Sequence, residues 1–517
     1  MTRTIDYSLY LVTGRELLPQ GKDYFESLEE SLQGGVTVVQ IREKKAETAE
    51  FLDIALKSKA ICDRYNVPLI INDRIDIALA IDADGIHVGQ TDMPVSMARK
   101  LLPQKCIIGV SCNNKEELQK ALENGADYVG IGAIYATQTK DLTKPLVGVR
   151  GIGPLLQMLD GTSVKAVAIG GINSKNVLRV LHGSVSGTGH SLDGIAVVSA
   201  IVALNQPRQA ASELSEILSE FKKGPSIFHG MSSAANGHTT DSITSGVVSL
   251  MNQIRTLNPL VHQITNSVVT AQSANITISI GASPIMATAV DEMSDLATIC
   301  GALLVNIGTL TPPACAGMLA AGCHVNTWKK PIVFDPVGVD LLNKWQPSVI
   351  KGNAGELAAL AGSIEVTSKG VDTVGNGFED PVGFVTALAR RERCIVVLTG
   401  KTDYVSDGHT CAVLDNGHEF LGKMTGSGCA TGSCIASFCA VASASAQTEG
   451  QSLRGVLAKG DMFLASIAGI LVFNVAAELA AARDDVKGPG TFFPALIDEL
   501  TSLTPEVVQE HIKIKIV

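Results

Sequence analysis

The sequence predicts an α/β protein of two domains, of which the first is a (β/α)8 TIM barrel. Strand-like and helix-like segments alternate from the start of the chain, and eight strand-like segments lie within residues 1–224. A chain of 517 residues is too long for one hydrophobic core. Hydrophobic residues make up 46% of it and 50 residues are glycine, a composition typical of α/β domains with many tight turns.

Charge and cysteine usage exclude several classes of function. The net charge of −10 argues against nucleic acid or an anionic membrane as partner. Eleven cysteines without a Cys-x-x-Cys pair indicate neither a zinc site nor a disulfide framework. The start of the chain has no apolar signal core, and Asn474 and Glu478 interrupt the longest apolar stretch, 466–482. We therefore expect a cytoplasmic protein in which that stretch is a buried helix.

The eight predicted strands are short and rich in β-branched residues. They are residues 8–13, 36–41, 68–72, 85–88, 107–110, 128–131, 164–169 and 194–197. Helical periodicity covers residues 23–33, 48–65, 115–124 and 208–223. In such a barrel the active site lies at the carboxyl ends of the strands.

The stretch 34–44 places a polar cluster at the carboxyl end of the second strand. Gln40, Arg42 and Lys44 share one face of an extended segment, so an amide and two cations point the same way. This pattern predicts a site for a polyanion. The alternative is a solvated basic strand end.

Two carboxylates follow neighbouring strands, Asp73 after the third and Asp92 after the fourth. Beside Arg and Lys they suit a magnesium–diphosphate complex, although each Asp alone is better explained as a helix cap. Gly170 and Gly171 follow the seventh strand and offer backbone N–H groups to a phosphate, or simply make a turn.

Residues 5–220 resemble thiamine phosphate synthase. The match is carried by Val-Gln-Ile-Arg-Glu-Lys at 39–44, Ile-Asn-Asp-Arg at 71–74, Gly-Ile-His-Val-Gly-Gln-Thr-Asp-Met-Pro at 85–94 and Ala-Ile-Gly-Gly-Ile at 168–172. The resemblance implies that Asp73 and Asp92 bind Mg²⁺. It also implies substrate contacts. For hydroxymethylpyrimidine diphosphate these are Gln40, Ile41, Arg42, Glu43, Lys44, Asn72, Ser111 and Lys140, and for thiazole phosphate they are Thr137, Gln138, Thr139, Gly170, Gly171, Val198 and Ser199.

The reaction that this resemblance implies is displacement of diphosphate from the pyrimidine methylene by the thiazole nitrogen. A ring nitrogen attacks through its lone pair, so the enzyme needs to neutralise the leaving group and align the rings. The family's chemistry implies a dissociative path.

A change of composition marks the joint between the two halves. Residues 225–242 are rich in Gly, Ser, Ala, Asn and Thr, which predicts a linker between a first domain, 1–224, and a second, 243–517.

Three features of the second half suit a nucleotide and its acceptor. Met286 follows a polar entry at 261–266 and either packs in the core or lines a ligand site. Asn353 and Glu356 lie one helical turn apart and either organise a magnesium–water shell around ATP or merely start a helix. Thr399 ends a predicted strand and suits nucleotide contact, but such an ending is also common as a turn.

The fourth feature is a glycine-rich loop, Thr-Gly-Ser-Gly-Cys, that opens a long apolar helix at 430–444. Gly426, Ser427 and Gly428 expose backbone N–H groups at the positive end of the helix dipole, which predicts an anion hole for a transferring phosphoryl group. Cys429 follows this loop. Its thiol is either inert and packed in the core, or has a pKa lowered by the helix N-terminus.

These pieces resemble hydroxyethylthiazole kinase over residues 245–500. The match includes Gly-Ala-Ser-Pro-Ile-Met at 281–286, Phe-Asp-Pro-Val-Gly at 334–338 and Gly-Asn-Ala-Gly-Glu at 352–356. The resemblance implies a ribokinase-like α/β domain in which Met286 and Gly426 contact the thiazole alcohol, Thr399 contacts ATP and Cys429 lies at the acceptor hydroxyl. The segment after Gly338 is shorter than in relatives and leaves the ATP-contacting Arg unassigned. The kinase family builds its site between subunits, so the resemblance implies a homo-oligomer that is at least a trimer, with a hexamer as the alternative.

Together the halves resemble the fused fungal type of thiamine enzyme, in which the kinase makes the thiazole phosphate that the synthase consumes. The implied small molecules are hydroxymethylpyrimidine diphosphate, hydroxyethylthiazole, its phosphate, ATP and Mg²⁺. Two alternatives stay open. Only one half could be catalytically active, or the chain could be a regulator that senses these ligands without turnover.

Overall fold

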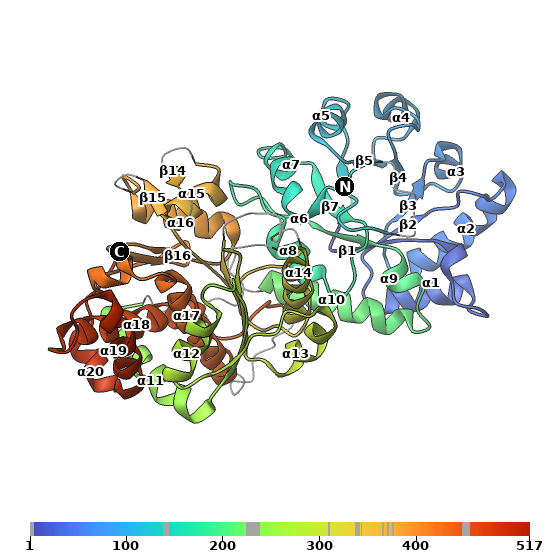
Figure 1. Cartoon of the computed structure of the whole chain (residues 1–517). Coiled ribbons are helices and arrows are strands. Elements are labelled where there is room, and N and C mark those ends of the chain that lie inside the picture. The colour runs from blue at the N-terminus through green and yellow to red at the C-terminus, as the bar shows by residue number, and fades with distance from the viewer. Residues whose placement is uncertain are drawn as a thin grey trace. The chain divides into compact units, whose positions relative to one another are not determined.

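The computed structural model describes residues 5–137, 144–223, 238–308, 311–336, 342, 344–363, 367–369, 372–374, 377–446 and 455–517. The predicted site residues Gln138, Thr139 and Lys140 lie outside these ranges. The chain divides into two compact units, Met1–Lys223 and Gly224–Val517 (Figure 1). Each unit is described by itself.

The first unit is a closed barrel of eight parallel strands in the order of the chain, so the prediction of this barrel is confirmed. The strands are β1 Leu9–Val12, β2 Val38–Ile41, β3 Leu69–Asn72, β4 Gly85–Val88, β5 Ile107–Cys112, β6 Tyr128–Ile131, β7 Lys165–Ile169 and β8 Gly194–Val197. Side chains on both faces of most strands are buried, because the interior of the barrel and the outer helices each cover one face.

The outer layer of the barrel unit consists of helices between the strands. They are η1 Arg15–Leu17, α1 Tyr24–Gln33, α2 Thr48–Arg64, α3 Ile75–Ala80, α4 Val95–Leu101, α5 Lys115–Glu123, α6 Gly148–Gly151, α7 Gly153–Gln157, α8 Val177–Gly183, α9 Ser199–Val202 and α10 Pro207–Lys223. Asp23 caps α1 by accepting a hydrogen bond from Glu26 N.

Aspartates tie neighbouring strands together in pairs at the amino ends of the barrel. Asp84 Oδ2 accepts from Leu69 N (2.9 Å), Asp127 Oδ2 from Ile108 N (2.7 Å) and Asp193 Oδ2 from Ala166 N (2.8 Å). Each carboxylate therefore satisfies an amide at the start of the neighbouring strand, at the end of the barrel opposite the predicted site.

The second unit is built on a mixed sheet of nine strands in the order β10-β9-β11-β12-β13-β16-β17-β18-β19. The strands are β9 Leu260–Ile264, β10 Ser283–Ile285, β11 Ala302–Asn306, β12 Ile332–Asp335, β13 Val349–Asn353, β16 Ile395–Thr399, β17 Asp403–Ser406, β18 Cys411–Leu414 and β19 Ile514–Ile516. A separate pair, β14 Thr367–Lys369 and β15 Asp372–Val374, is antiparallel. The first six strands of the large sheet are parallel, and the last three are antiparallel.

Helices cover both faces of this sheet and make two hydrophobic cores. One face packs against α11 Thr240–Leu257, α12 Thr270–Ser279, α17 Ser427–Ser445, α18 Met462–Ala482, α19 Pro489–Ser502 and α20 Pro505–His511. The other packs against α13 Met293–Ile299, α14 Pro312–Thr327, α15 Ala354–Ala361 and α16 Pro381–Glu392. Short helices η2 Val290–Glu292 and η4 Glu419–Lys423 lie in the connections.

By length and composition α17 and α18 could each cross a membrane, but most of each helix is buried inside the second unit. The predicted buried helix at 466–482 is thus confirmed as part of α18. Helix α11 begins at Thr240, within the predicted linker, because Thr239 and Ser242 form a capping box.

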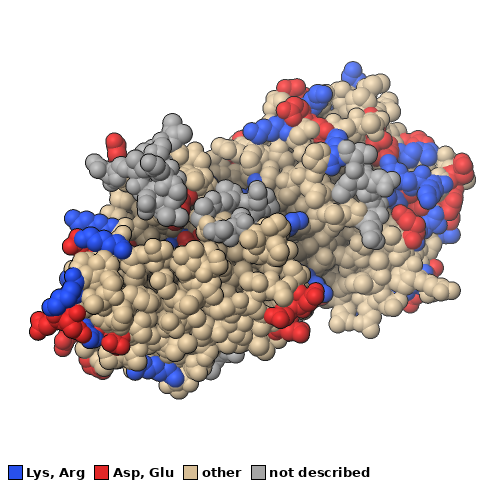
Figure 2. Space-filling model, in the orientation of Figure 1, with Lys and Arg blue, Asp and Glu red and all other residues tan. Residues whose placement is uncertain are grey.

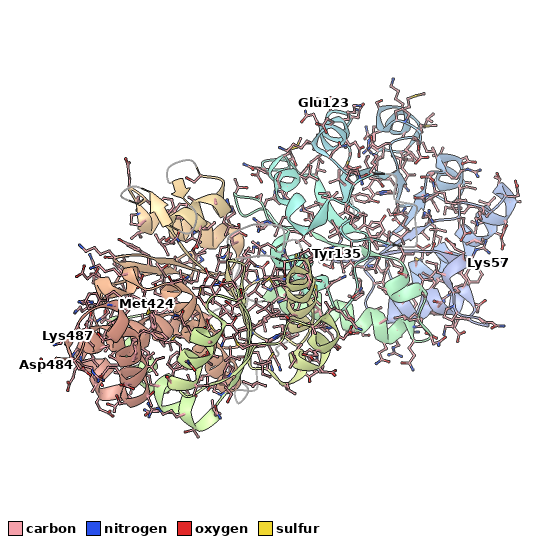
Figure 3. The ribbon with its side chains drawn as sticks, viewed as in Figure 1. Lys57, Glu123, Tyr135, Met424, Asp484 and Lys487 are labelled. Atoms are coloured by element: carbon pink, nitrogen blue, oxygen red, sulfur yellow. The ribbon has the colours of Figure 1, made fainter. Side chains whose placement is uncertain are left out.

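Charged side chains are distributed differently over the visible faces of the two units. In Figure 2, Lys, Arg, Asp and Glu are dense over part of the barrel unit, whereas those of the second unit gather at its edges around an area without charge. Labelled side chains such as Lys57 and Glu123 of the barrel unit, and Asp484 and Lys487 of the second, project from exposed positions (Figure 3).

Candidate active sites

The barrel site starts with Gln40 and Asn72, which meet at the carboxyl ends of β2 and β3. Gln40 Nε2 donates to Asn72 Oδ1 at 2.7 Å, and both side chains are buried. Each strand delivers its residue to the same edge because the strands pair in parallel, with Gln40 opposite Ile70. Two predicted substrate-binding residues are therefore brought together.

The predicted metal ligands meet beside them. Lys44 Nζ forms an ion pair with Asp73 Oδ2, and the Asp92 carboxylate lies close enough to act on Asp73. Burial raises the pKa of Asp73 and Asp92 raises it further, while Lys44 opposes the shift. Asp92 Oδ2 also accepts from Gly89 N at 2.7 Å, which fixes its position in the turn after β4.

Arg42 and Glu43 do not join this point. Arg42 Nη1 lies 3.8 Å from Glu16 Oε1. Glu43 receives two hydrogen bonds from Arg15, at 2.9 and 3.0 Å, so its carboxylate is already paired. Gln40 and Lys44 thus contact the consecutive residues Asn72 and Asp73, whereas Arg42 lies beside Glu16 of η1, so convergence of residues 40, 42 and 44 on one substrate stays a prediction.

A chain of hydrogen bonds crosses the interior of the barrel below the site. Tyr10 OH donates to Gln40 Oε1 (3.0 Å) and lies 2.7 Å from Tyr128 OH. His87 bridges Tyr128 OH (Nδ1, 3.0 Å) and Ser111 Oγ (Nε2, 2.9 Å). Sequence reasoning missed Tyr10, His87 and Tyr128; their inward position on three barrel strands was the available signal.

Gly170 and Gly171 make a turn and not a helix start, because α8 begins only at Val177. Both have positive φ, 108° and 66°, and a Cβ on either would lie under 3 Å from the backbone or Cβ atoms of residues 133–136. Close packing and positive φ therefore explain why both positions are glycine, and the contact of their backbone N–H groups with a phosphate stays a prediction. Thr137 lies beyond β6, while Val198 and Ser199 follow β8, so all three stand at the carboxyl end of the barrel.

In the second unit four polar residues end neighbouring strands at one edge of the sheet. They are Asn306 of β11, Asp335 of β12, Asn353 of β13 and Thr399 of β16. Parallel pairing sets Asn306 opposite Asp335 and Asn353 opposite Thr399. From β9 the chain runs first to β10, on one side of β9, and then crosses to β11, on the other side of β9. The strand order therefore reverses at this edge, and such a switch point is where α/β sheets bind ligands.

A buried ion pair lies beneath this edge. Lys351 Nζ is 3.2 Å from both carboxylate oxygens of Asp335, and Asn306 Nδ2 donates to Asp335 Oδ2 at 2.7 Å. Burial disfavours the charged Lys351, but the Asp335 and Glu356 carboxylates outweigh it and raise the pKa of the ammonium. Lys351 is therefore a fixed cation. Sequence reasoning missed its role, although it directly precedes the Gly-Asn-Ala-Gly-Glu motif.

The glycine loop lies over this cation. A Cβ on Gly428 would be 3.1 Å from Lys351 Nζ, and Gly426, at φ 84°, would place a Cβ 2.5 Å from Val269 Cγ1. Gly426 is the N-cap of α17 and Ser427 its first residue. Met424, which precedes the loop (Figure 3), packs on the core and anchors it. The first backbone N–H groups of α17 and the Lys351 ammonium therefore lie close together, as an anion site requires.

Cys429 joins the same cluster as a neutral thiol. Asn306 Nδ2 lies 3.0 Å from its Sγ atom. Burial, followed by the nearby Asp335 carboxylate, raises the pKa of Cys429. The burial of the thiol and its anionic neighbour favour the alternative in which Cys429 is inert packing.

Asn353 and Glu356 form a capping box at the start of α15. Glu356 N donates to Asn353 Oδ1 (3.0 Å), and Asn353 N donates to Glu356 Oε2 (2.8 Å). These two residues therefore form an ordinary helix start. The capping box also holds Glu356 close to Asp335, so burial and the Asp335 carboxylate raise the pKa of Glu356.

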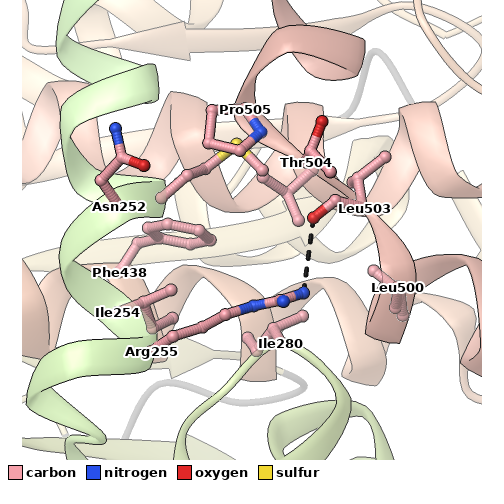
Figure 4. Close-up of a pocket in the computed structure, with 11 residues that line it drawn as sticks. Asn252, Ile254, Arg255, Ile280, Phe438, Leu500, Leu503, Thr504 and Pro505 are labelled. Carbon is pink, nitrogen blue, oxygen red and sulfur yellow. Dashed lines mark hydrogen bonds between the residues drawn. The ribbon is translucent and has the colours of Figure 1, made fainter.

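Met286 is half-buried directly after β10, next to the switch point. A cavity of about 220 Å³ lies elsewhere, near Phe438 and Leu500 (Figure 4). Arg255 Nη2 crosses it to the carbonyls of Thr501 (2.6 Å) and Leu503 (3.4 Å). None of the described residues that line the cavity is a predicted site residue. Arg255 stabilises the carboxyl end of α19 through these hydrogen bonds.

The described part of each candidate site does not supply a complete set of metal ligands from protein side chains. Among the described residues, no three His, Cys, Asp or Glu side chains converge as a set that could hold an ion. Pairs of carboxylates are present, Asp73 with Asp92 and Asp335 with Glu356. Such pairs fit Mg²⁺ that takes its other ligands from substrate phosphates and water.

Comparison with known proteins agrees with this division. The family model described as thiamine monophosphate synthase matches residues 9–201, and that of the hydroxyethylthiazole kinase family matches residues 251–506. The chain is 45% identical over 211 residues to the thiamine-phosphate synthase of Alkaliphilus oremlandii, covering 41% of this chain and 95% of that protein.

Two fungal relatives match nearly the whole chain. The probable thiamine biosynthetic bifunctional enzyme of Schizosaccharomyces pombe is 37% identical, with 99% of this chain and 98% of that protein covered. The thiamine biosynthetic bifunctional enzyme of Saccharomyces cerevisiae is 36% identical, with 97% and 96% covered. The chain therefore belongs to the family of bifunctional thiamine biosynthetic enzymes, with a thiamine phosphate synthase domain followed by a hydroxyethylthiazole kinase domain.

Proposed function

We propose that coupling of the pyrimidine and thiazole halves takes place at the carboxyl end of the barrel, around Asp73, Asp92 and Lys44. The proximity of the two carboxylates and the ammonium supports this assignment. Mg²⁺ bound there supplies charge neutralisation for the departing diphosphate. The carboxylates of Asp73 and Asp92 repel one another, and the single charge of Lys44 offsets this repulsion only in part. A divalent cation bound between them would offset it further.

The remaining barrel residues orient the reactants. Gln40 and Asn72 present amide groups beside the metal pair, and Ser111 is held by His87. The thiazole nitrogen attacks through its own lone pair and needs no base, so alignment and electrostatic stabilisation of the leaving group are the protein's main contributions. We assign Arg42, Thr137, Gln138, Thr139, Lys140, Val198 and Ser199 to phosphate and substrate contacts on the resemblance alone.

The second unit, a ribokinase-like domain in this proposal, transfers the phosphoryl group of ATP to hydroxyethylthiazole at the start of α17. Lys351 and the backbone of residues 426–428 are placed to stabilise the charge on the transferring group. Thr399 and Asn353 stand on adjacent strands, where ATP is expected, and Asp335 and Glu356 are placed to hold its Mg²⁺. Met286 and Cys429 flank the acceptor alcohol.

A single experiment on the full chain separates this function from its alternatives. Given hydroxyethylthiazole and ATP alone, the protein should form thiazole phosphate, and addition of hydroxymethylpyrimidine diphosphate should then yield thiamine phosphate. Product in only one of the two steps would mean that one half is inactive. Ligand binding without any product would indicate a sensor.

Assembly and location complete the proposal. The second unit exposes Val268 and Ile278, 69% and 60% accessible, at either end of α12 on a unit whose visible surface is poor in charge. These side chains support contact with further copies of the chain in a trimer or hexamer. Sedimentation of the active protein tests this, and an active monomer would refute it. We place the protein in the cytoplasm, and cysteines that form no disulfide bond, such as Cys62 and Cys434, support a reducing compartment.

A further inference from the structure

Helix α18 is largely buried, yet it carries two polar side chains where apolar residues would be expected. Asn474 and Glu478 lie four residues apart, on the same face of a helix that is otherwise almost wholly apolar. A leucine would pack in this core without the cost of removing an amide from water. The contacts of these two side chains therefore indicate what they do.

Asn474 holds the turn that follows β16. Its Nδ2 atom donates to Asp403 Oδ2 at 2.8 Å and to the carbonyl of Asn416 at 2.9 Å. The other carboxylate oxygen of Asp403 accepts from Gly400 N at 2.9 Å. A buried link thus runs from α18 through Asp403 to the residue directly after Thr399.

Glu478 holds the neighbouring loop, which follows β18. Its Oε1 atom accepts from Gly417 N (2.9 Å), Asn416 Nδ2 (3.2 Å) and Lys513 Nζ (3.0 Å). Residues 415–417 begin the segment that runs through η4 to the glycine loop at Gly426. Thr402 Oγ1 also donates to Asp415 Oδ1 at 2.7 Å, so the turn and the loop are tied to each other.

Both segments lie at the same edge of the sheet as the candidate site. Asp403 pairs with Leu414, so the start of β17 and the end of β18 stand beside the carboxyl end of β16. The polar face of α18 reaches two segments at this edge from within the core. A helix packed on every side is a rigid support for loops that must keep their position when a ligand binds.

We propose that Asn474 and Asp403 are positioning residues for the nucleoside triphosphate: they fix the backbone of residues 399–403 in the conformation that binds ATP, and Glu478 fixes residues 415–417 beside it. This inference rests on the proposed contact between Thr399 and ATP. Neither Asn474 nor Asp403 touches the reacting atoms; both act through the turn.

The test is steady-state kinetics of the full chain carrying Asn474→Leu. Loss of a hydrogen bond to a carboxylate should raise the KM for ATP by about tenfold or more. The KM for hydroxyethylthiazole should stay within about twofold, since nothing near Met286 changes. Coupling of supplied thiazole phosphate by the barrel, measured in the same preparation, reports that the rest of the chain is intact.

The matched control is Ser466→Ala. Ser466 is buried in the same helix and donates to Met462 O at 2.7 Å, but it touches neither loop, so its removal should leave the KM for ATP unchanged. An equal effect of both variants would overturn the proposal. So would a normal KM for ATP in Asn474→Leu.

Two further variants keep the outcome decisive. If Asn474→Leu does not fold, Asp403→Asn breaks the same link without a change of volume and should raise the KM for ATP alone. Thr399→Val tests the nucleotide location itself. An unchanged KM for ATP in Thr399→Val refutes that location, whereas a Thr399 effect without an Asn474 effect refutes only the positioning role.

Discussion

Lys351 and Asp335 form a buried ion pair in which one ammonium lies 3.2 Å from both oxygens of one carboxylate. Asn306 binds the same carboxylate and reaches Cys429, so the pair is connected to the start of α17. The position of the cation under the glycine loop is therefore set by three neighbouring strands at once.

The first prediction separates the stability of this pair from its function. Lys351→Met leaves Asp335 as a buried uncompensated charge and should lower the free energy of unfolding of the second unit by about 3–5 kcal/mol. Adding Asp335→Leu removes that charge and should restore much of the stability, since apolar replacements of buried pairs are often neutral. Kinase turnover should stay lost in both variants. Denaturant unfolding and kinase assays on the two proteins check this, and kinase activity in the double variant would exclude Lys351 from phosphate binding.

The second prediction concerns the glycine loop. Gly428→Val should abolish kinase turnover, because a Cβ there would stand 3.1 Å from Lys351 Nζ and the two methyl groups would fill the anion site. Cys429→Ser should keep measurable turnover, because the thiol is neutral and the loop stabilises the phosphoryl group without it. Kinase assays at saturating ATP compare the two, with barrel coupling as internal control. Full kinase activity in Gly428→Val would show that the loop does not bind phosphate.

The third prediction concerns the barrel metal site. Asp92→Ala should reduce kcat/KM for coupling at least about a hundredfold, because metal assistance is worth several kcal/mol. Kinase turnover should be near normal, since the glycine loop lies in the other unit. Coupling rates measured over a range of Mg²⁺ concentrations test this assignment. Asp53→Ala, which removes an exposed carboxylate paired with Lys57, serves as control and should have no effect.

The fourth prediction concerns the interior hydrogen bonds of the barrel. Tyr128→Phe removes a hydroxyl that lies between Tyr10 and His87, and should lower the unfolding free energy by about 1–3 kcal/mol and weaken binding of the pyrimidine diphosphate. Tyr65→Phe is the control, because its hydroxyl donates to Glu29 Oε1 at 3.0 Å between the outer helices α1 and α2. Thermal unfolding and the KM for coupling distinguish them. An equal KM for the pyrimidine diphosphate in both variants would show that the hydrogen bonds inside the barrel have no role in binding this substrate.

The fifth prediction is a pH dependence of stability. Burial, the main cause, raises the pKa of Asp403 to about 6, with Asp415 adding to the shift and Lys351 opposing it. Between about pH 4 and 6 the folded protein keeps a proton that the unfolded chain has lost, so the stability contributed by this group falls as pH rises through that interval. The difference in unfolding free energy between wild type and Asp403→Asn should therefore change by about 3 kcal/mol from pH 4 to 7. A difference that is constant with pH would contradict this protonation of Asp403.

The sequence by itself determined the strands of the barrel and the apolar helix of the second unit. Runs of β-branched residues predict the strands because each strand is buried on both faces. The periodicity of apolar residues predicts the helices, because a helix is apolar on the face that it buries, or on every face where it is fully buried. The residues at strand ends, such as Asn72 and Asp335, could also be predicted, since parallel strands bring their carboxyl ends to one edge.

Only the tertiary structure decided which of these residues meet. Glu43 pairs with Arg15, Gly170 packs on Ala133, and Lys351 reaches under Gly428. The polar residues of α18 read in the sequence only as interruptions of an apolar helix, yet in the fold they bind two loops. Such partners lie tens or hundreds of residues apart, and local pattern carries no information on which side chains the packing of strands and helices will bring within hydrogen-bond distance.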